Sequence, residues 1–193
     1  MLSRISTWLL KRLGWTVHAD FPDTGKYVLI VAPHTSNWDF PLGIVAKTAL
    51  KLDARWMGKH TLFRWPVGWF FRALGGVPVR RDRALNMIHQ MADLFAGPGE
   101  TVLALAPEGT RTKKGHWKTG FYHIARAAEV PIAMAYLDYG RKEVGLGGTF
   151  YPGDDIEAVF ARIREFYHDR KGKYPEQESS IQPRDKDSKK AGP

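Results

Sequence analysis

Short apolar runs alternate along the chain with segments whose apolar residues recur every three or four positions. The runs are typical of buried strands, and they occupy residues 27–31, 54–57, 77–79, 101–106, 131–137 and 144–151. The helical spacing is clearest in residues 40–52, 85–95, 121–128 and 156–167. For a chain of 193 residues, this alternation predicts a single α/β domain with a mostly parallel central sheet flanked by helices.

Three polar motifs follow predicted strands at the point where each strand ends. His34, Arg81 and Glu108 each lie just beyond the carboxyl end of a different strand. The carboxyl ends of parallel strands share one edge of a sheet, and ligands bind in the crevice outside that edge. We therefore expect the three motifs to open into one site, because folding requirements alone do not place three polar motifs there.

The first of these motifs pairs a histidine with a carboxylate. Asp39 follows His34 by five residues, at the start of a predicted helix. A carboxylate hydrogen-bonded to one ring nitrogen keeps the other nitrogen as a proton acceptor, which is what a general base needs. The structural alternative is that His34 caps the helix and Asp39 is a first-turn acid favoured by the helix dipole. The convergence of three motifs on one edge favours the catalytic interpretation.

Several other chemistries find no support in the sequence. The chain has no cysteine, which excludes disulfides, thiolate nucleophiles and cysteine zinc sites. It has no G-x-S-x-G elbow, and Ser36 is the only serine between Ser6 and Ser179, which argues against a serine hydrolase. The spacing of His34 and Asp39 does not match a helical pair of metal ligands, so no metal site is expected.

The positive charge of the chain is concentrated in two windows. Residues 55–83 hold seven Lys or Arg against one acid, and residues 111–126 hold five against none. Both windows adjoin the polar motifs, and together they exceed the net charge of +9 of the whole chain. This indicates an anionic partner: a membrane surface, a phosphorylated ligand or nucleic acid. Nucleic acid is not expected, since no known binding module is visible and the helix at 83–96 is not notably basic.

Residues 1–14 form a predicted amphipathic helix at the N-terminus. Its apolar stripe is surrounded by Arg4, Lys11 and Arg12, and it consists of Leu2, Ile5, Trp8, Leu9 and Leu13. A short basic helix with tryptophan is typical of an interfacial membrane anchor, and a helix packed on its own domain is the alternative. No apolar run approaches the length of a membrane span, so we expect any attachment to be peripheral.

Two further segments stand out by composition. Residues 62–74 hold five aromatic side chains and two arginines, which suits an acyl pocket, contact with lipid headgroups or an ordinary core. Residues 171–193 are polar, with proline, serine and mixed charge, and they predict a disordered tail.

The motifs, taken in order, resemble those of the glycerolipid acyltransferases, the 1-acylglycerol-3-phosphate (lysophosphatidic acid) acyltransferase group. Residues 34–39 resemble the H-x4-D block, 76–81 the second block, 105–111 the P-E-G-T-R block and 118–120 the K-x-G that follows. A weaker V-P-I block matches residues 130–132. The chain departs from the family pattern at three positions, where Asp, Phe and Gly are usual: Arg80, Trp117 and Glu129.

This resemblance implies a glycerol-3-phosphate acyltransferase-like fold over residues 15–170. It also implies that His34, oriented by Asp39, takes a proton from an acceptor hydroxyl, which then attacks the thioester of an acyl carrier. The donor would be acyl-CoA or acyl carrier protein, and no other cofactor is implied. The residues that correspond to the family's substrate contacts are Arg81, Glu108, Gly109, Thr110, Arg111 and Lys118.

The acceptor implied by the resemblance is a lysophospholipid resembling 1-acylglycerol-3-phosphate. Two alternatives stay open from the sequence: another lipid acceptor, such as lyso-ornithine lipid, and a non-enzymatic basic module that binds membrane or nucleic acid. A lipid acceptor, together with the basic N-terminal helix, leads us to expect a cytoplasmic protein held peripherally on the inner face of an anionic membrane.

Overall fold

The computed structural model describes residues 1–79 and 84–184, with only the backbone described for residues 84–86. Within these residues, seven strands form one sheet in the order β1-β7-β6-β2-β5-β3-β4. Five of them run parallel, β7 is antiparallel to β6, and β1 pairs with β7. The mostly parallel α/β fold is therefore confirmed. The strands are β1 (Thr16–Ala19), β2 (Lys26–Ala32), β3 (Ala54–Lys59), β4 (Gly76–Val79), β5 (Thr101–Leu105), β6 (Ile132–Asp138) and β7 (Glu143–Phe150).

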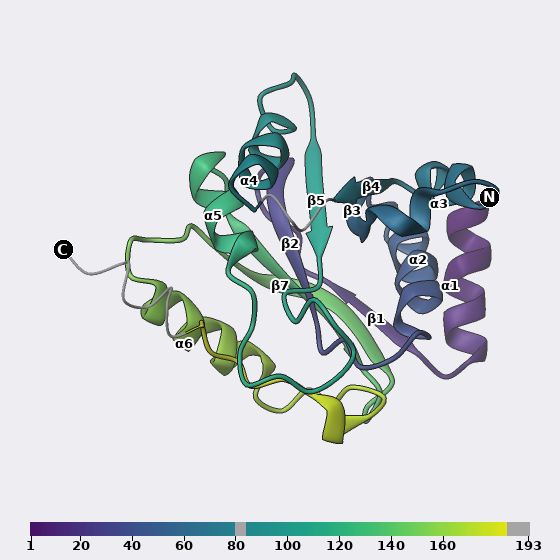
Figure 1. Cartoon of the computed structure of the whole chain (residues 1–193). Coiled ribbons are helices and arrows are strands. Elements are labelled where there is room, and N and C mark those ends of the chain that lie inside the picture. The colour runs from purple at the N-terminus through teal and green to yellow at the C-terminus, as the bar shows by residue number, and fades with distance from the viewer. Residues whose placement is uncertain (80–83, 185–193) are drawn as a thin grey trace.

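Helices cover both faces of this sheet. In Figure 1, α1 and α2 lie on one side of the strands, and α4, α5 and α6 lie on the other. A short 3-10 turn, η1, and the short helix α3 follow β3 at the far edge of the sheet, and η2 lies near the C-terminus. The helices are α1 (Leu2–Arg12), α2 (Asp39–Ala49), η1 (His60–Phe63), α3 (Gly68–Ala73), α4 (Ala84–Asp93), α5 (Gly120–Ala127), α6 (Ile156–Tyr167) and η2 (Pro175–Gln177).

The two faces of the sheet differ in side-chain size. In β6, Ile132 and Met134 point toward the helices α4 to α6 and join the large core there, because alternate residues of a strand face opposite ways. The intervening Ala133 and Ala135 point toward α2, where Ala104 of β5 also contributes only a methyl group. Small side chains on this face leave space between α2 and the sheet.

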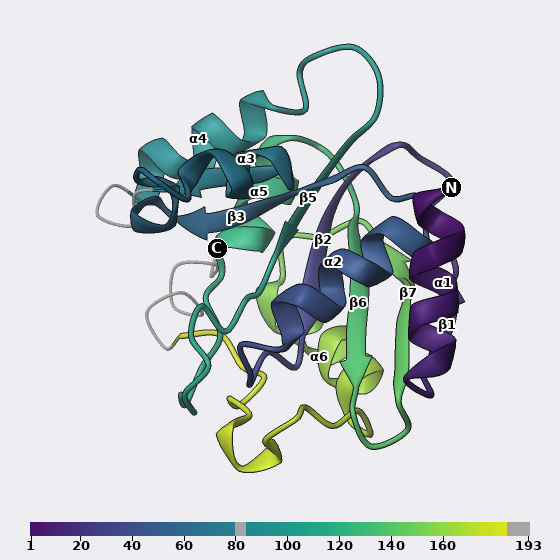
Figure 2. The same cartoon turned by 90° about the vertical axis from the view of Figure 1, so that its right-hand side faces the viewer.

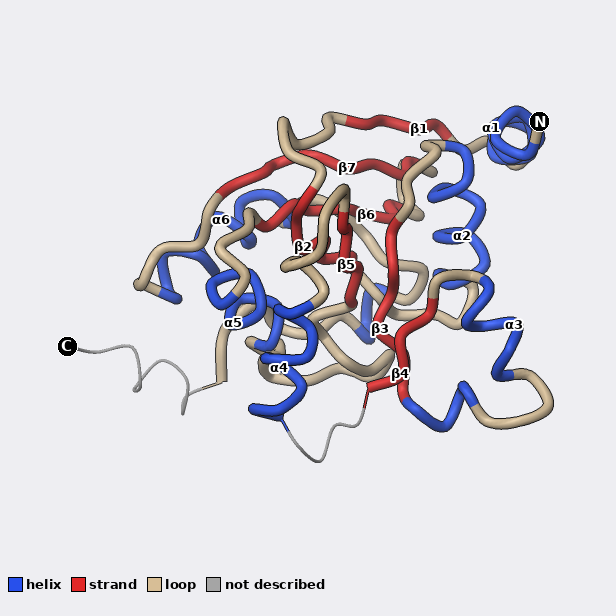
Figure 3. Tube along the Cα trace, turned by 90° about the horizontal axis from the view of Figure 1, so that it is seen from above, coloured by secondary structure: helices blue, strands red, loops and turns tan. Residues whose placement is uncertain are grey.

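The helix α1 packs on α2 with its less apolar side. Ser3 donates a hydrogen bond to the carbonyl oxygen of Ala49 at 3.0 Å, and Leu10 is buried in a cluster that includes Ala46 of α2. Figures 2 and 3 show the two helices next to each other outside the sheet. The predicted apolar stripe therefore faces outward, and Trp8 remains 63% exposed.

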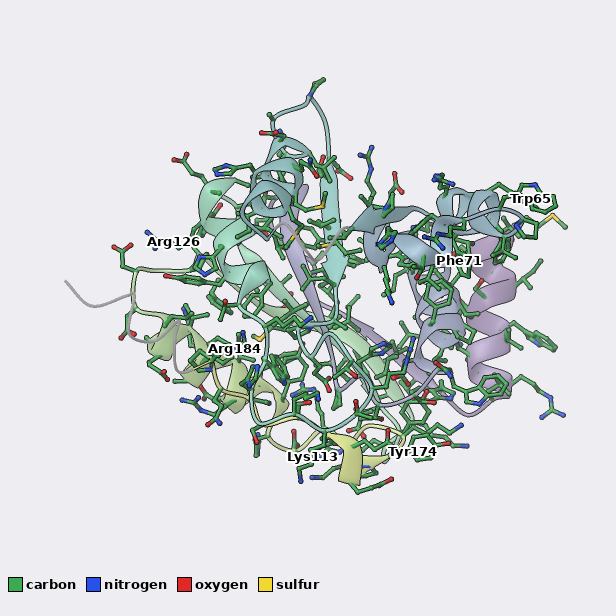
Figure 4. The ribbon with its side chains drawn as sticks, in the orientation of Figure 1. Trp65, Phe71, Lys113, Arg126, Tyr174 and Arg184 are labelled. Carbon is green, nitrogen blue, oxygen red and sulfur yellow. The ribbon has the colours of Figure 1, made fainter. Side chains whose placement is uncertain are left out.

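The prediction of a disordered tail is wrong for residues 171–184. This segment, which we call the C-terminal strap, crosses the loop after β5 and the end of β2. Its hydrogen bonds join Lys114 N–H to the Ser179 hydroxyl at 3.0 Å, Trp117 N–H to the Gln182 carbonyl at 2.9 Å, and Tyr174 N–H to the Thr35 hydroxyl at 3.1 Å. In Figure 4, Lys113 and Tyr174 accordingly lie at the same end of the molecule. The polar composition did not predict this order, because hydrogen bonds of the backbone hold the segment and few apolar side chains contribute. Residues 185–193 lie outside the described part.

No helix in the described ranges 1–79 and 84–184 combines the length and the apolar character needed to cross a bilayer.

Candidate active site

The loop between β2 and α2 brings the predicted histidine and carboxylate together. β2 ends at Ala32 and α2 begins at Asp39, so the chain turns sharply at the carboxyl edge of the sheet. His34 Nδ1 lies 3.0 Å from Asp39 Oδ2. The same oxygen accepts the N–H of Ser36 at 2.9 Å, which fixes the loop to the first turn of the helix.

Asp39 is held in its ionised form by these contacts. Asp39 is only 4% exposed, and burial by itself would raise the pKa of its carboxyl group. The hydrogen bonds from His34, Ser36 and Tyr139 outweigh burial and bring the pKa of Asp39 below its ordinary value. An ionised Asp39 orients the Nδ1–H of His34 toward itself, which leaves Nε2 as the proton acceptor.

Tyr139 is a member of this cluster that the sequence did not single out. Its hydroxyl donates to Asp39 Oδ1 at 2.8 Å, across a hundred residues of chain. Neither spacing nor composition connects the two positions, and only the pairing of β6 with β2 brings the end of β6 beside the H-x4-D loop.

Glu108 supports the same loop from the neighbouring strand. Its Oε1 accepts the backbone N–H of His34 at 2.6 Å, and the residue is only 3% exposed. Burial, with added repulsion from Glu178 and Asp39, raises the pKa of Glu108 to about 8. This geometry makes Glu108 a support for the position of His34, and its contact with substrate stays a prediction.

In the same P-E-G-T-R block, Arg111 contacts the H-x4-D loop, and Gly109 lies against Lys118. Arg111 donates from Nε to the carbonyl oxygen of Ser36 at 3.2 Å, so its guanidinium lies between the two loops. Gly109 has a φ of +65°, and a Cβ there would come within 2.8 Å of Lys118 Cε. The Lys118 side chain therefore lies close against the Gly109 backbone, and a side chain at position 109 would displace it.

Thr110 and Arg81 are the other two predicted substrate contacts. The Thr110 hydroxyl lies 2.8 Å from the Thr112 hydroxyl in the exposed part of the loop. Arg81 falls outside the described residues, as does Arg80, so the role of Arg81 as a phosphate ligand stays a prediction.

An apolar cavity runs between α2 and the sheet and begins at the histidine. Its empty space is about 990 Å³, including the part open to solvent. His34 and Asp39 line one end, and Lys47 and Leu50, at the far end of α2, line the other. The ammonium group of Lys47 donates to the carbonyl oxygen of Ala54 in the adjacent strand, so the charge at this end of the cavity has a hydrogen-bond partner. Its lining combines the small Ala104 and Ala135 of the sheet and Gly43 of the helix with larger apolar side chains such as Leu29 and Leu146.

The aromatic segment 62–74 divides between core and surface. Phe63 and Phe71 pack with Trp56 beside this cavity, at ring distances of 5.7 and 6.0 Å. Trp65, in contrast, is 91% exposed, and Trp69 is also exposed. Figure 4 shows Trp65 pointing away from the body of the protein, whereas Phe71 lies inside it.

Comparison with known proteins identifies a similar fold and a family. The fold is similar to that in the crystal structure of the 1-acyl-sn-glycerophosphate (LPA) acyltransferase PlsC from Thermotoga maritima, with a TM-score of 0.56. The two chains are 21% identical, and the match covers 89% of this chain and 80% of that one. None of the curated proteins matches the sequence. A model of the Acyltransferase family matches residues 15–137, which include the H-x4-D and P-E-G-T-R blocks, and the chain therefore belongs to the Acyltransferase family.

Proposed function

We propose that the protein transfers a fatty acyl group from a thioester carrier to a hydroxyl of a lysophospholipid-type acceptor, with His34 as the general base. The observation that carries this proposal is the placement of the His34–Asp39 pair at the mouth of an apolar cavity. Membership of the Acyltransferase family supports the reaction class. The acceptor class is suggested by the similar fold of an LPA acyltransferase.

The proposed chemistry needs no covalent enzyme intermediate. Nε2 of His34 takes the proton of the acceptor hydroxyl while that oxygen attacks the thioester carbonyl carbon. The tetrahedral intermediate collapses as the carbon–sulfur bond breaks, and the departing thiolate receives the proton from the imidazolium. Asp39 stabilises the transient positive charge on His34, because its carboxylate is ionised and lies 3.0 Å from Nδ1.

The acyl chain of the donor has a matching place in the structure. In this proposal it enters beside His34 and lies between α2 and the sheet, against Val31, Ala104 and Leu146. Each buried methylene contributes about 0.8 kcal/mol, so such a cavity favours a long chain over a short one. The carrier, acyl-CoA or acyl carrier protein, stays outside the mouth.

In this proposal, the acceptor phosphate is held by basic residues of the second block, of the P-E-G-T-R block and of the K-x-G that follows. Arg111 already lies beside the H-x4-D loop, and Lys118 lies against Gly109. Together with Arg81, they supply charge-assisted hydrogen bonds to a phosphate group. In this proposal, a phosphate bound there leaves the free hydroxyl of the lysophospholipid near His34.

A lipid acceptor also requires a way to approach the membrane. The helices α1, α2 and α3 lie on the side of the molecule that faces the viewer in Figure 2. The stripe of α1 is exposed there, as are Trp65, just before α3, and Trp69, within α3. Arg4 and Arg64 add positive charge to these two stretches. We propose that this side, named here the α1–α3 face, rests on an anionic membrane, with the enzyme on the cytoplasmic side.

The direct test combines donors and acceptors in one panel. Purified protein is incubated with palmitoyl-CoA or palmitoyl-acyl carrier protein and with lysophosphatidate, lysophosphatidylcholine or lyso-ornithine lipid. Thiol release and product mass are measured together. We expect diacyl product from lysophosphatidate with at least one donor. Product from lyso-ornithine lipid alone would reassign the acceptor, and no product from any pair would favour the non-enzymatic binding module.

A further inference from the structure

The Asp39 carboxylate is bound at both of its oxygens. Oδ2 receives the imidazole of His34 at 3.0 Å and the N–H of Ser36 at 2.9 Å. Oδ1 receives the hydroxyl of Tyr139 at 2.8 Å. Loss of the Tyr139 hydroxyl would leave Oδ1 of a nearly buried carboxylate without this partner, so that only the contacts at Oδ2 would orient the carboxylate.

Tyr139 is itself held firmly in position. It is the first residue after β6, and its backbone N–H donates to the carbonyl oxygen of Lys171 in the C-terminal strap at 2.9 Å. Its ring meets Trp15 edge-on, with centroids 5.1 Å apart, and the ammonium group of Lys173 lies 6.0 Å from its centroid. Contacts with Trp15, with the C-terminal strap and with the end of β6 therefore fix the direction of the Tyr139 hydroxyl.

We infer that Tyr139 is a positioning residue of the transfer reaction, which fixes the Asp39 carboxylate and, through it, the imidazole of His34. The inference rests on the proposed function, because it assigns a role in that reaction. Tyr139 does not touch the reacting atoms in this scheme. Its contribution is preorganisation, because a base held in the reactive geometry need not be ordered during the reaction.

The test replaces Tyr139 with phenylalanine, which keeps the ring against Trp15 and removes only the hydroxyl. A hydrogen bond to a charged group is worth enough to change a rate about tenfold, so we expect kcat to fall by about that factor. The KM values for donor and acceptor should change less than about twofold. The matched control is Tyr122→Phe, which also removes a tyrosine hydroxyl, one that donates hydrogen bonds to the carbonyl oxygens of Gly153 and Asp154.

A double-mutant cycle separates positioning from general stability. If Tyr139 acts through Asp39, Tyr139→Phe should have little further effect on kcat in an Asp39→Asn background. A fall of kcat in Tyr139→Phe that is matched by Tyr122→Phe, or that multiplies fully with Asp39→Asn, would overturn the inference. An unchanged kcat in Tyr139→Phe would overturn it as well.

A second measurement does not depend on turnover. The Nδ1–H proton of His34, observed by NMR, should shift or broaden in Tyr139→Phe and stay unchanged in Tyr122→Phe. An Nδ1–H signal identical in wild type and Tyr139→Phe would contradict the inference. If the wild type itself lacked transfer activity, the proposed function would fail, and this signal would still decide whether Tyr139 orders His34 through Asp39.

Discussion

The carboxyl group of Glu108 lies in a place where ionisation is costly. Its pKa is raised from an ordinary 4.5 to about 8, chiefly by burial. Between these two pH values the folded protein binds a proton that the unfolded chain has released. The free energy of unfolding contributed by Glu108 is therefore fully present below pH 4.5, and it falls as the pH rises toward 8.

Replacement of Glu108 by glutamine tests this linkage. The amide oxygen can still accept the N–H of His34, while the ionisable group is gone. We expect Glu108→Gln to become more stable relative to wild type as the pH rises from 4.5 to 8, with no further gain above 8. Calorimetric melting temperatures across that range measure the difference, and Glu157→Gln, on the exposed start of α6, is the matched control. Parallel curves for Glu108→Gln and wild type would show that Glu108 ionises normally.

Single residues also show where sequence reasoning succeeds and where it ends. The sequence predicts Asp39 as the partner of His34 because the two lie five residues apart, between the end of a strand and the start of a helix, and they are in contact. Tyr139 reaches the same carboxylate from the end of β6, and nothing local to residue 139 marks it. Glu129, a departure from the family pattern, has a φ of +54°, a backbone conformation that favours the glycine usual at this position.

Among the structural elements, α2 offers a sharp test of the acyl cavity. A Cβ at Gly43 would meet nothing within 4 Å, although the residue lines the cavity. Gly43→Leu should fill this space and lower kcat/KM for long acyl donors at least tenfold, while a short acyl donor is spared. Removal of a glycine from a helix interior should not reduce stability.

The measurement is kcat/KM with a series of acyl-CoA chain lengths, and Gly43→Ala is the control that adds a single methyl group. An unchanged chain-length profile in Gly43→Leu would mean that the acyl chain lies elsewhere.

The C-terminal strap is expected to contribute to stability. A chain that ends at Arg170 loses the hydrogen bonds to Lys114, Trp117 and Thr35. Relative to a chain ending at Arg184, we expect a fall in melting temperature of roughly 5–10 °C, from a net loss of a few kcal/mol. Equal melting temperatures of the two chains would show that residues 171–184 add nothing to the folded state.

At this scale, apolar periodicity predicted the elements that build the core and missed those held by polar contacts. The strands β2, β5 and β6 and the helices α5 and α6 lie where the pattern placed them. The four-residue strand β1 has little burial, and the strap is held mainly through its backbone, so neither leaves an apolar pattern. In α1 the apolar residues were read correctly as a stripe, yet the side that packs on α2 is partly polar.

Over the whole molecule, exposed apolar side chains gather where the proposal places the membrane. Trp8 of α1 and Trp65 before α3 both lie on the α1–α3 face and are mostly exposed. The double change Trp8→Ala and Trp65→Ala should reduce binding to liposomes that contain anionic lipid at least tenfold, since each buried aromatic side chain contributes about 1.5–3 kcal/mol. Binding of the wild type should weaken as salt rises, because screening reduces the attraction of nearby Lys and Arg.

Co-sedimentation measures this binding, and Tyr151→Ala, an exposed aromatic residue before α6, is the control. Activity on a monomeric short-chain acceptor should survive the double change. A wild type that ignores anionic liposomes at low salt would contradict membrane attachment through the α1–α3 face.

The central claim is that His34 is the base for acyl transfer. The backbone N–H of His34 holds its loop to Glu108, so His34→Ala removes the imidazole without removing that contact. The decisive measurement is thiol release from palmitoyl-CoA or palmitoyl-acyl carrier protein in the presence of lysophosphatidate, with product mass as confirmation. We expect a fall of about 10²- to 10⁴-fold in His34→Ala at an unchanged melting temperature. A wild-type rate in His34→Ala would contradict the claim.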